Sequence, residues 1–269
     1  MPVTQDDFFA ALKEIAPLDL AAEWDNVGLL IEGPKERTIK SVLICIDLTH
    51  PVLDEAMQHQ VDAIVSYHPP IFSGVKRLTR RNPGQHLLVR LLEAGITVWS
   101  PHTALDATPG GLGDWLLDGL GPCRDRAPIE PCTSRPNDPA YGMGRSGRLL
   151  TPTPLSELIT TLKPYLGLST LRVATAARHQ EGAPIKRVAV CPGAGGSLFS
   201  QLRFVDLLLT GEMRHHDILN RVANGTSVIL TDHTNTERGY LPLLAKQLED
   251  ALPLKALLST VDTDPLSVV

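Results

Sequence analysis

Several features that mark special classes of protein are absent from this chain or scarce in it. No stretch approaches 18 consecutive apolar residues, so the sequence predicts no transmembrane helix. There is no basic surplus either, because 25 lysines and arginines face 30 acidic residues and the net charge is −5. A general binder of nucleic acid or of anionic membranes carries such a surplus. Neither partner is therefore expected, although a local basic patch is compatible with these totals.

Cysteines are also few. None of the four belongs to a C-x-x-C pair, and Cys45 and Cys191 lie inside apolar runs, where buried free thiols are expected. The sequence therefore predicts no disulfide framework and no cysteine zinc site. The first residues lack the basic flank and the apolar core of a signal peptide, so the predicted location is cytoplasmic.

The composition is that of an ordinary globular protein, with 43% hydrophobic and 20% charged residues. Apolar runs alternate with amphipathic segments in two stretches of the chain, which predicts a largely parallel sheet covered by helices in each. We therefore predict an α/β fold of two similar βα-repeat halves, with mixed or parallel sheets flanked by helices and a metal site between the halves. The predicted parts are a first half over 1–120, a linker and connecting region over 121–185, and a second half over 186–269.

The two halves correspond segment by segment. Each has a strand, a helix, a strand that begins with Val-Asp (Val61-Asp62 and Val205-Asp206), a polar strand end, a helix and a further strand. This order indicates an internal duplication. It would place equivalent strand ends at the edge of a parallel sheet where ligands bind.

A histidine and a carboxylate follow the last of these strands in each half. His102 precedes Asp106 by four residues, and His233 precedes Glu237 by the same distance. With His68, which ends another apolar strand, they form a set of nitrogen and oxygen donors that suits divalent Zn, Mn, Fe or Ni. The alternative is that both carboxylates cap the helices that follow them and that His68 is structural.

Other polar segments have both a structural and a functional interpretation. Asp25 and Asn26 precede a glycine, where they form a turn or, with Trp24, wall a pocket. Glu212 would act as a general base beside a metal, unless its segment is only a turn before a charged helix. The glycine-rich turn over 192–197 would bind an anion or allow tight packing of a strand against a helix.

A series of motifs runs in order through nearly the whole chain. It consists of Trp24-Asp25-Asn26-Val27-Gly28-Leu29, Ser66-Tyr67-His68-Pro69-Pro70-Ile71-Phe72, His102-Thr103-Ala104-Leu105-Asp106, Gly110-Gly111 with Asp114-Trp115, Thr210-Gly211-Glu212, and His233 with Glu237. This series resembles the NIF-three-like family, whose members are often labelled GTP cyclohydrolase 1 type 2. The resemblance implies a two-part α/β protein with a dinuclear metal site in a ring-shaped homohexamer. Residues 121–185 are too few for the inserted domain of many members, so the chain resembles the compact form.

By this resemblance, His68 and Asp106 hold one metal ion, His233 holds the other, and Glu237 bridges both. One residue departs from the family pattern, because Tyr67 stands where the family commonly has another histidine. A neutral phenol, with an ordinary pKa of about 10, is a poorer ligand than an imidazole. The second metal site would then be weaker or empty unless His102, or the histidine pair at 215–216, compensates.

Two functions are compatible with these residues. The first is a metal-dependent hydrolase, in which one or two divalent ions activate water and Glu212 or His102 moves protons. The family label implies a small-molecule substrate for it, a nucleotide such as GTP or a cyclic amide. The second is a non-enzymatic metal-binding scaffold, or a regulatory factor that acts through protein partners.

Overall fold

The computed structural model of the protein describes residues 2–267, which form two compact units. Unit 1 contains the chain up to Leu105 and again from Tyr240, and unit 2 contains Asp106–Gly239. These boundaries differ from those of the three predicted parts, 1–120, 121–185 and 186–269. Strand β13 (Lys255–Leu258), near the end of the chain, pairs in parallel with β2 (Ser41–Cys45) and so belongs to unit 1. Within the described residues, no helix is long and apolar enough to span a bilayer.

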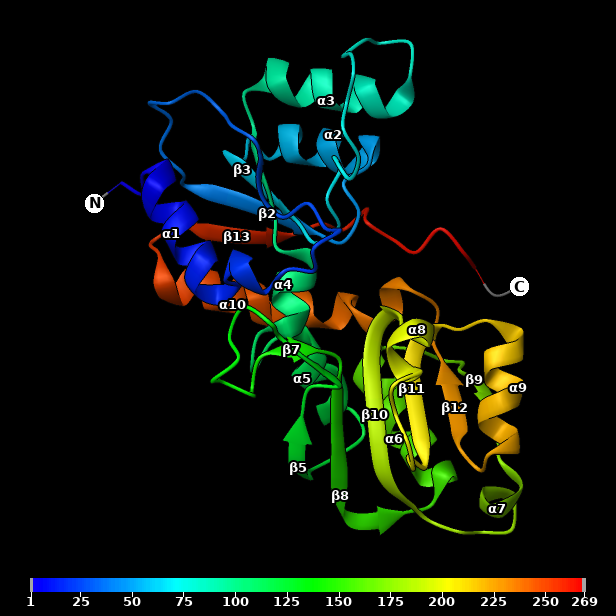
Figure 1. Ribbon diagram of the computed structural model, residues 1–269. Coiled ribbons are helices and arrows are strands. Elements are labelled where there is room, and N and C mark those ends of the chain that lie inside the picture. The colour runs from blue at the N-terminus through cyan, green and yellow to red at the C-terminus, as the bar shows by residue number, and fades with distance from the viewer. Residues whose placement is uncertain (1, 268–269) are drawn as a thin grey trace. The chain divides into compact units, whose positions relative to one another are not determined.

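Unit 1 is built on a five-stranded sheet with the order β1-β4-β3-β2-β13. Figure 1 labels three of its strands, β3, β2 and β13. Four strands run parallel, and the edge strand β1 pairs antiparallel with β4. Residues of β2 and β3 are buried on both faces, which explains why these strands read as continuous apolar runs. The strands not yet bounded are β1 (Gly28–Ile31), β3 (Ala63–Ser66) and β4 (Thr97–Ser100).

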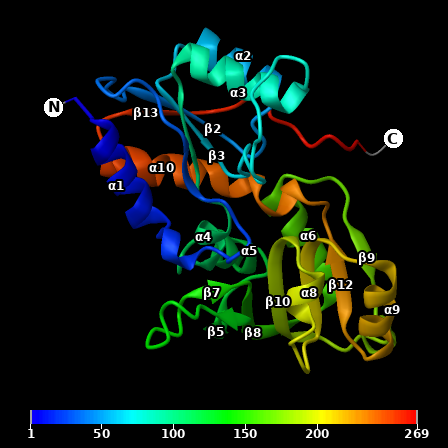
Figure 2. The same ribbon diagram turned by 45° about the horizontal axis from the view of Figure 1, so that its top comes forward.

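Helices cover both faces of this sheet (Figure 2). On one face, α2 (His50–Gln58) and α3 (Pro83–Ala94) share a core cluster with Leu43 and Ile64 of the sheet. On the other face, α1 (Gln5–Ile15) lies beside α10 (Leu241–Ala251). The side chain of Thr4 accepts a hydrogen bond from Asp7 N at 3.1 Å, and the Asp7 carboxylate accepts one from Thr4 N, so a capping box begins α1.

Unit 2 contains a six-stranded sheet with the order β5-β8-β10-β11-β12-β9. The three strands β10, β11 and β12 are parallel, and the other three pair antiparallel at the two sides. The strands are β5 (Cys123–Ala127), β8 (Arg145–Thr153), β9 (Arg172–Ala174), β10 (Ile185–Ala194), β11 (Leu207–Glu212) and β12 (Ser227–Leu230). A separate ribbon pairs β6 (Glu130–Pro131) with β7 (Gly142–Met143).

Helices flank this sheet as well. Phe199 of α8 packs in one core cluster with Leu208 and Val228 of the sheet. Trp115 of α5 stacks on Tyr165 of α6, with the ring centroids 5.3 Å apart. The helices are α4 (His102–Ala107), which crosses the boundary between the units, α5 (Leu112–Asp118), α6 (Leu155–Leu166), α7 (Ala177–Gln180), α8 (Gly196–Phe199) and α9 (His215–Ala223).

The first part of the predicted linker and connecting region over 121–185 contains three strands, β5, β6 and β7. All but the first residue of β5 are exposed, since it is an edge strand, and this exposure explains its polar sequence. The predicted fold class is confirmed: both units contain a mixed sheet with parallel strands at its centre and helices on its faces.

The two sheets share an order of pairing, β1-β4-β3-β2 in unit 1 and β9-β12-β11-β10 in unit 2. They also share a contact at the start of their parallel strands. Asp62 Oδ2 accepts hydrogen bonds from Lys40 N and Ser41 N, at 2.8 and 3.3 Å. Asp206 Oδ2 accepts the equivalent bonds from Lys186 N and Arg187 N, at 2.9 and 2.8 Å. These correspondences agree with an internal duplication.

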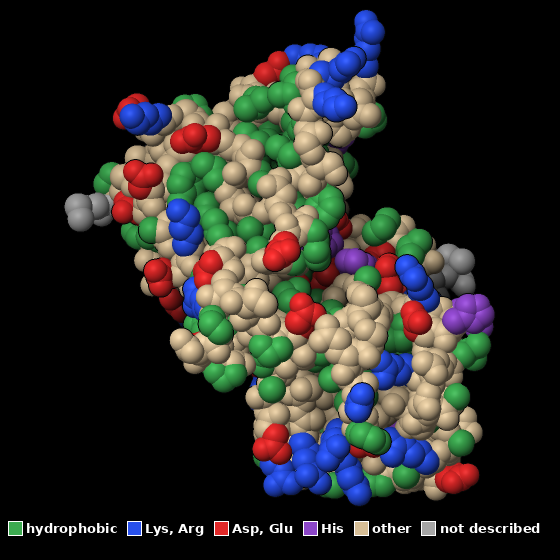
Figure 3. All heavy atoms as spheres, in the orientation of Figure 1, with side chains coloured by type: hydrophobic (Ala, Val, Ile, Leu, Met, Phe, Trp, Pro, Cys, Tyr) green, Lys and Arg blue, Asp and Glu red, His purple; other side chains and the backbone are tan. Residues whose placement is uncertain are grey.

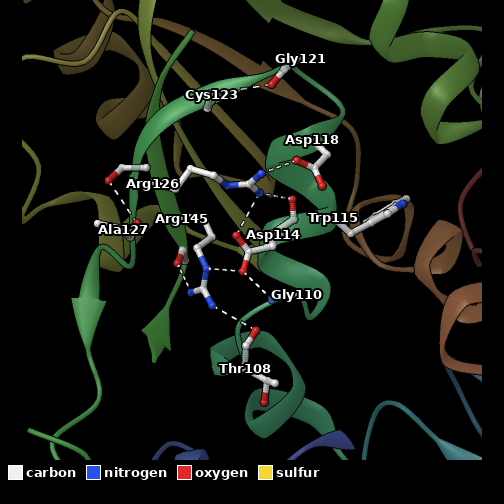
Figure 4. Close-up of polar contacts among 12 residues, drawn as sticks. Thr108, Gly110, Asp114, Trp115, Asp118, Gly121, Cys123, Arg126, Ala127 and Arg145 are labelled. Atoms are coloured by element: carbon white, nitrogen blue, oxygen red, sulfur yellow. Dashed lines mark hydrogen bonds and ion pairs between the residues drawn. The ribbon is translucent and has the colours of Figure 1, made fainter. Parts of the chain in front are cut away.

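A buried guanidinium joins three segments of unit 2 (Figure 4). The side chain of Arg145, 2% exposed, donates from Nε to Asp114 Oδ2 at 2.9 Å. Its Nη1 donates to the carbonyls of residues 142 and 144, at 2.5 and 2.7 Å, and Nη2 donates to those of Ala107 and Thr108, at 3.3 and 3.1 Å. Arg145 therefore fixes the end of α4, the helix that carries Asp106.

Replacing Arg145 by Met should lower the free energy of unfolding by roughly 3–5 kcal/mol, because the carboxylate of Asp114 and four backbone carbonyls would each lose one hydrogen-bond donor. Urea denaturation followed by circular dichroism measures the change. The control is Arg124→Met, which removes an arginine of β5 whose side chain is 58% exposed and should cost no more than about 0.5 kcal/mol. Equal losses in the two variants would contradict a structural role for Arg145.

Candidate metal centre

Polar residues gather at the carboxyl ends of the parallel strands in both sheets. Parallel strands all present these ends at the same edge, which is where open α/β sheets bind ligands. In unit 1, Asp47, His68 and His102 follow strands β2, β3 and β4. In unit 2, Glu212 ends β11 and His233 follows β12.

The imidazole of His68 is oriented by a carboxylate that sequence reasoning missed. His68 Nδ1 lies 2.9 Å from Asp47 Oδ1. A carboxylate can only accept this hydrogen bond, so the proton is on Nδ1 and Nε2 carries the lone pair that can bind a metal. The position of Asp47, directly after an apolar strand, was the available signal.

His102 is held in the same way. Its Nδ1 lies 2.7 Å from Oδ1 of Asp25, whose side chain is fully buried. The other oxygen of Asp25 accepts hydrogen bonds from Thr103 N, at 3.2 Å, and from the Thr103 hydroxyl. Burial opposes ionisation of Asp25, but the hydrogen bonds from His102 and Thr103 and the charge of His102 keep its pKa below the ordinary value. Asp25 is therefore more than a turn residue, because it fixes the tautomer of His102.

Tyr67, the departure from the family pattern, packs beside both histidines. It is 1% exposed, and its ring centroid lies 5.0 Å from that of His68 and 5.5 Å from that of His102. The ring centroid of Trp24 lies 6.0 Å from that of His102, and Trp24 is 63% exposed. Aromatic rings therefore limit the movement of both imidazoles in unit 1.

In unit 2, each ring nitrogen of His233 faces a carboxylate. Nε2 lies 3.6 Å from Glu237 Oε1, and Nδ1 lies 3.5 Å from Glu212 Oε2. Glu237 is 2% exposed and Asp106 is 7% exposed. Burial of the Cys191 thiol, followed by the charges of Asp106 and Glu237, raises its pKa, so both carboxylates act on the same small region. In unit 2, His233 and Glu237 thus lie together, and the carboxylate of Asp106 acts on the same buried thiol as that of Glu237.

The alternative that these carboxylates cap the following helices was wrong. Helix α5 begins after Gly111, and α10 begins after Tyr240. The helix predicted from Glu237 starts instead with two 3₁₀ turns, Thr234–Thr236 and Arg238–Tyr240. Glu237 lies between these turns and points into the protein, as its low exposure requires.

Glycine keeps the space beside His233 and Glu237 open. A Cβ on Gly193 would lie 2.7 Å from His233 Nε2 and 3.1 Å from Glu237 Oε1. The N–H of Gly193 donates to the Thr236 hydroxyl at 2.8 Å, so this group serves the packing of the turn. An imidazole and a buried carboxylate beside an open space fit a divalent ion of the zinc, manganese, iron or nickel type.

Glu212, the predicted general base, lies at the border of this cluster. Its side chain is 55% exposed, and it lines a hollow of about 600 Å³ together with Ser197 and Asp217. His215 and His216 are exposed at the start of α9, with their rings 5.5 Å apart. Glu212 can therefore contact both His233 and a molecule in the hollow.

Gly193→Ala should weaken the binding of a divalent ion at least tenfold without removing a ligand, because the new methyl group occupies the space between the donors. Isothermal titration with Zn²⁺ or Mn²⁺ measures this. Gly167→Ala is the matched control: its φ of +70° resembles the +59° of Gly193, but nothing lies within 4 Å of its Cβ. A Gly193→Ala affinity equal to that of Gly167→Ala and of the wild type would contradict a role of this space in metal binding.

The comparisons with known proteins agree on one family. The profile of the Duf34/NIF3 (NGG1p interacting factor 3) family matches residues 3–265. The chain is 39% identical over 262 residues to NIF3-like protein 1 of Drosophila melanogaster, covering 96% of this chain and 87% of that protein. It is 40% identical over 260 residues to the NIF3 homologue of Schizosaccharomyces pombe, covering 93% and 92%.

Solved structures show the same fold. A Bacillus cereus protein related to NIF3 superposes with a TM-score of 0.87 at 19% identity and covers both chains completely. Reduced HcgD of Methanocaldococcus jannaschii superposes with a TM-score of 0.82 at 24% identity, covering 96% of this chain and 98% of that one. The chain belongs to the Duf34/NIF3 family.

Proposed function

We propose that the protein is a metal-dependent hydrolase. Its divalent ion would be held by His68, Asp106, His233 and Glu237, whose imidazole and carboxylate groups are donors of the kind that such an ion takes. The observation that carries the proposal lies in unit 2, where His233 and the buried carboxylate of Glu237 line the space that Gly193 leaves open. By resemblance to the family, Glu237 would bridge two ions if both are bound.

A bound divalent ion lowers the pKa of coordinated water toward about 7 and so supplies hydroxide near neutrality. The protein's own residues would handle the protons. Glu212 is exposed on the hollow and lies beside His233, so it can accept a proton from a reacting group. His102 is a second candidate, because Asp25 holds the proton on Nδ1 and leaves Nε2 as the basic nitrogen.

The substrate class is proposed from the family label alone. It is a nucleotide such as GTP, or another cyclic amide that water can open. The hollow of about 600 Å³ beside Glu212 has the size of small-molecule sites, which range over roughly 300–1,000 Å³. A homohexamer and a cytoplasmic location stay predictions, which light scattering and cell fractionation test.

A regulatory function through protein partners is the second candidate. One observation favours it: a Saccharomyces cerevisiae relative, 36% identical over 258 residues, is named NGG1-interacting factor 3. In this case the metal would stabilise the fold or the assembly, and chelation would change the oligomeric state without any loss of turnover.

The decisive experiment compares metal-loaded wild type with Glu237→Gln and Glu212→Gln on GTP, ATP and dihydrouracil. Glu237→Gln should bind metal at least tenfold more weakly. Glu212→Gln should keep its metal but lower kcat by about 10²–10⁴, the usual contribution of a general base. Metal content is measured by mass spectrometry and turnover by chromatography.

The control is His59→Ala, which removes an exposed histidine at the end of α2 and should change neither quantity. Turnover that is equal in the metal-free protein and in all variants would refute the hydrolase. Metal-dependent assembly with no turnover on any of the three substrates would favour the regulatory function.

A further inference from the structure

The amino-terminal edge of the unit 2 sheet carries a basic hollow, here called the amino-edge pocket. It has a volume of about 670 Å³ and lies where β10, β11 and β12 begin, at the opposite end of these strands from Glu212 and His233. Figure 3 shows lysine and arginine side chains gathered over this lower end of unit 2. Its cationic lining consists of Arg148, Arg178, Lys186, Arg187, Arg203 and Arg221.

The charge of this pocket is almost uncompensated. Asp206 is the one acidic residue of the lining, against six cations. Both of its oxygens are already used, because Oδ2 accepts the N–H groups of Lys186 and Arg187, and Oδ1 pairs with Arg178. Such a concentration of positive charge, in a chain whose net charge is −5, creates a local potential that attracts anions.

Unit 1 shows which part of this arrangement the fold itself needs. The equivalent Asp62 accepts hydrogen bonds from the backbone at the start of β2 and lies 3.7 Å from one arginine, Arg37. The aspartate contact and a single arginine are therefore enough to align the strands. Among the described residues of unit 2, no ion pair engages Arg148, Lys186, Arg187 or Arg203. These four cations have no structural partner and remain available to a ligand.

An aromatic ring stands at the rim of the same pocket. Phe204 is 83% exposed, and its φ of +56° lies in the left-handed region that bulky residues rarely adopt. Arg221 donates to the carbonyls of Phe199 and Leu202 and so fixes the loop that leads to Phe204. The backbone thus holds an apolar ring in water next to arginines, an arrangement suited to stacking on a base.

We propose that the amino-edge pocket binds a nucleoside di- or triphosphate, with the phosphates on the free cations and the base on Phe204. Guanidinium groups bind phosphate through paired N–H donors. A mononucleotide fits better than a nucleic-acid strand, because the pocket has the volume of a small-molecule site and its lining contains a single aromatic residue. This site is separate from the carboxyl-edge cluster and does not depend on the proposed hydrolysis.

Titration calorimetry of the whole protein in EDTA tests the proposal, because without metal the result is independent of the proposed hydrolase. ATP and GTP should bind to the wild type. The double variant Arg187→Gln with Arg203→Gln should bind each nucleotide at least tenfold more weakly. Phe204→Ala should lower the affinity for ATP about tenfold but leave the affinity for inorganic tripolyphosphate within twofold of the wild-type value. Lys246→Gln, a change at an exposed lysine of α10, is the control and should leave the affinity for both ligands unchanged.

Other outcomes would overturn the proposal. If the double arginine variant bound ATP as tightly as the wild type, the amino-edge pocket would not be the binding site. Unchanged binding in Phe204→Ala would refute the stacked base. A single-stranded oligonucleotide that binds more than tenfold tighter than ATP, through the same arginines, would identify the pocket as a surface for a nucleic-acid strand. Circular dichroism of each variant separates these outcomes from loss of fold.

Discussion

Parallel pairing of short strands is the constraint on which the rest of this protein depends. Parallel strands cannot be joined by tight turns, so every connection must cross the sheet and every strand must present its carboxyl end at the same edge. Asp62 and Asp206 align the starting ends through backbone N–H groups of the preceding strand. With the starts aligned, the positions of His68 and His102 in unit 1, and of Glu212 and His233 in unit 2, follow from strand length alone.

The same constraint gives unit 2 an electrostatic polarity. Acidic and imidazole groups occupy the carboxyl edge, while six cations line the amino edge. A strand of six residues such as β11 spans roughly 20 Å, so these groups are separated by about two Debye lengths at physiological ionic strength. Neither edge can therefore neutralise the other, and each can bind a ligand of opposite charge independently.

Periodicity was enough to predict the fold class and to place His68, His102 and His233 after strands, because both depend on local sequence. The orienting residues were not predictable in this way. Asp25 meets His102 across 77 residues of sequence, and Arg145 reaches Ala107 across 38. The edge strand β5 resembled a linker because an exposed strand does not need apolar side chains. The amino-edge pocket could not be predicted, because its cations are scattered along the chain and the chain as a whole has more acidic than basic residues.

The candidate ligands are organised before any ion binds. Carboxylates fix the tautomers of His68 and His102, and Gly193 reserves a space beside His233. Two residues with positive φ, His102 and Asp232, follow equivalent strands of the two units. Such conformations cost roughly 1–2 kcal/mol each, and they persist only where the surrounding packing enforces them. Because folding has already met the cost of orienting these groups, more of the interaction energy with an ion remains as affinity. The strain at His102 and Asp232 is thus best understood as part of the same preorganisation that Asp25 and Asp47 supply through hydrogen bonds.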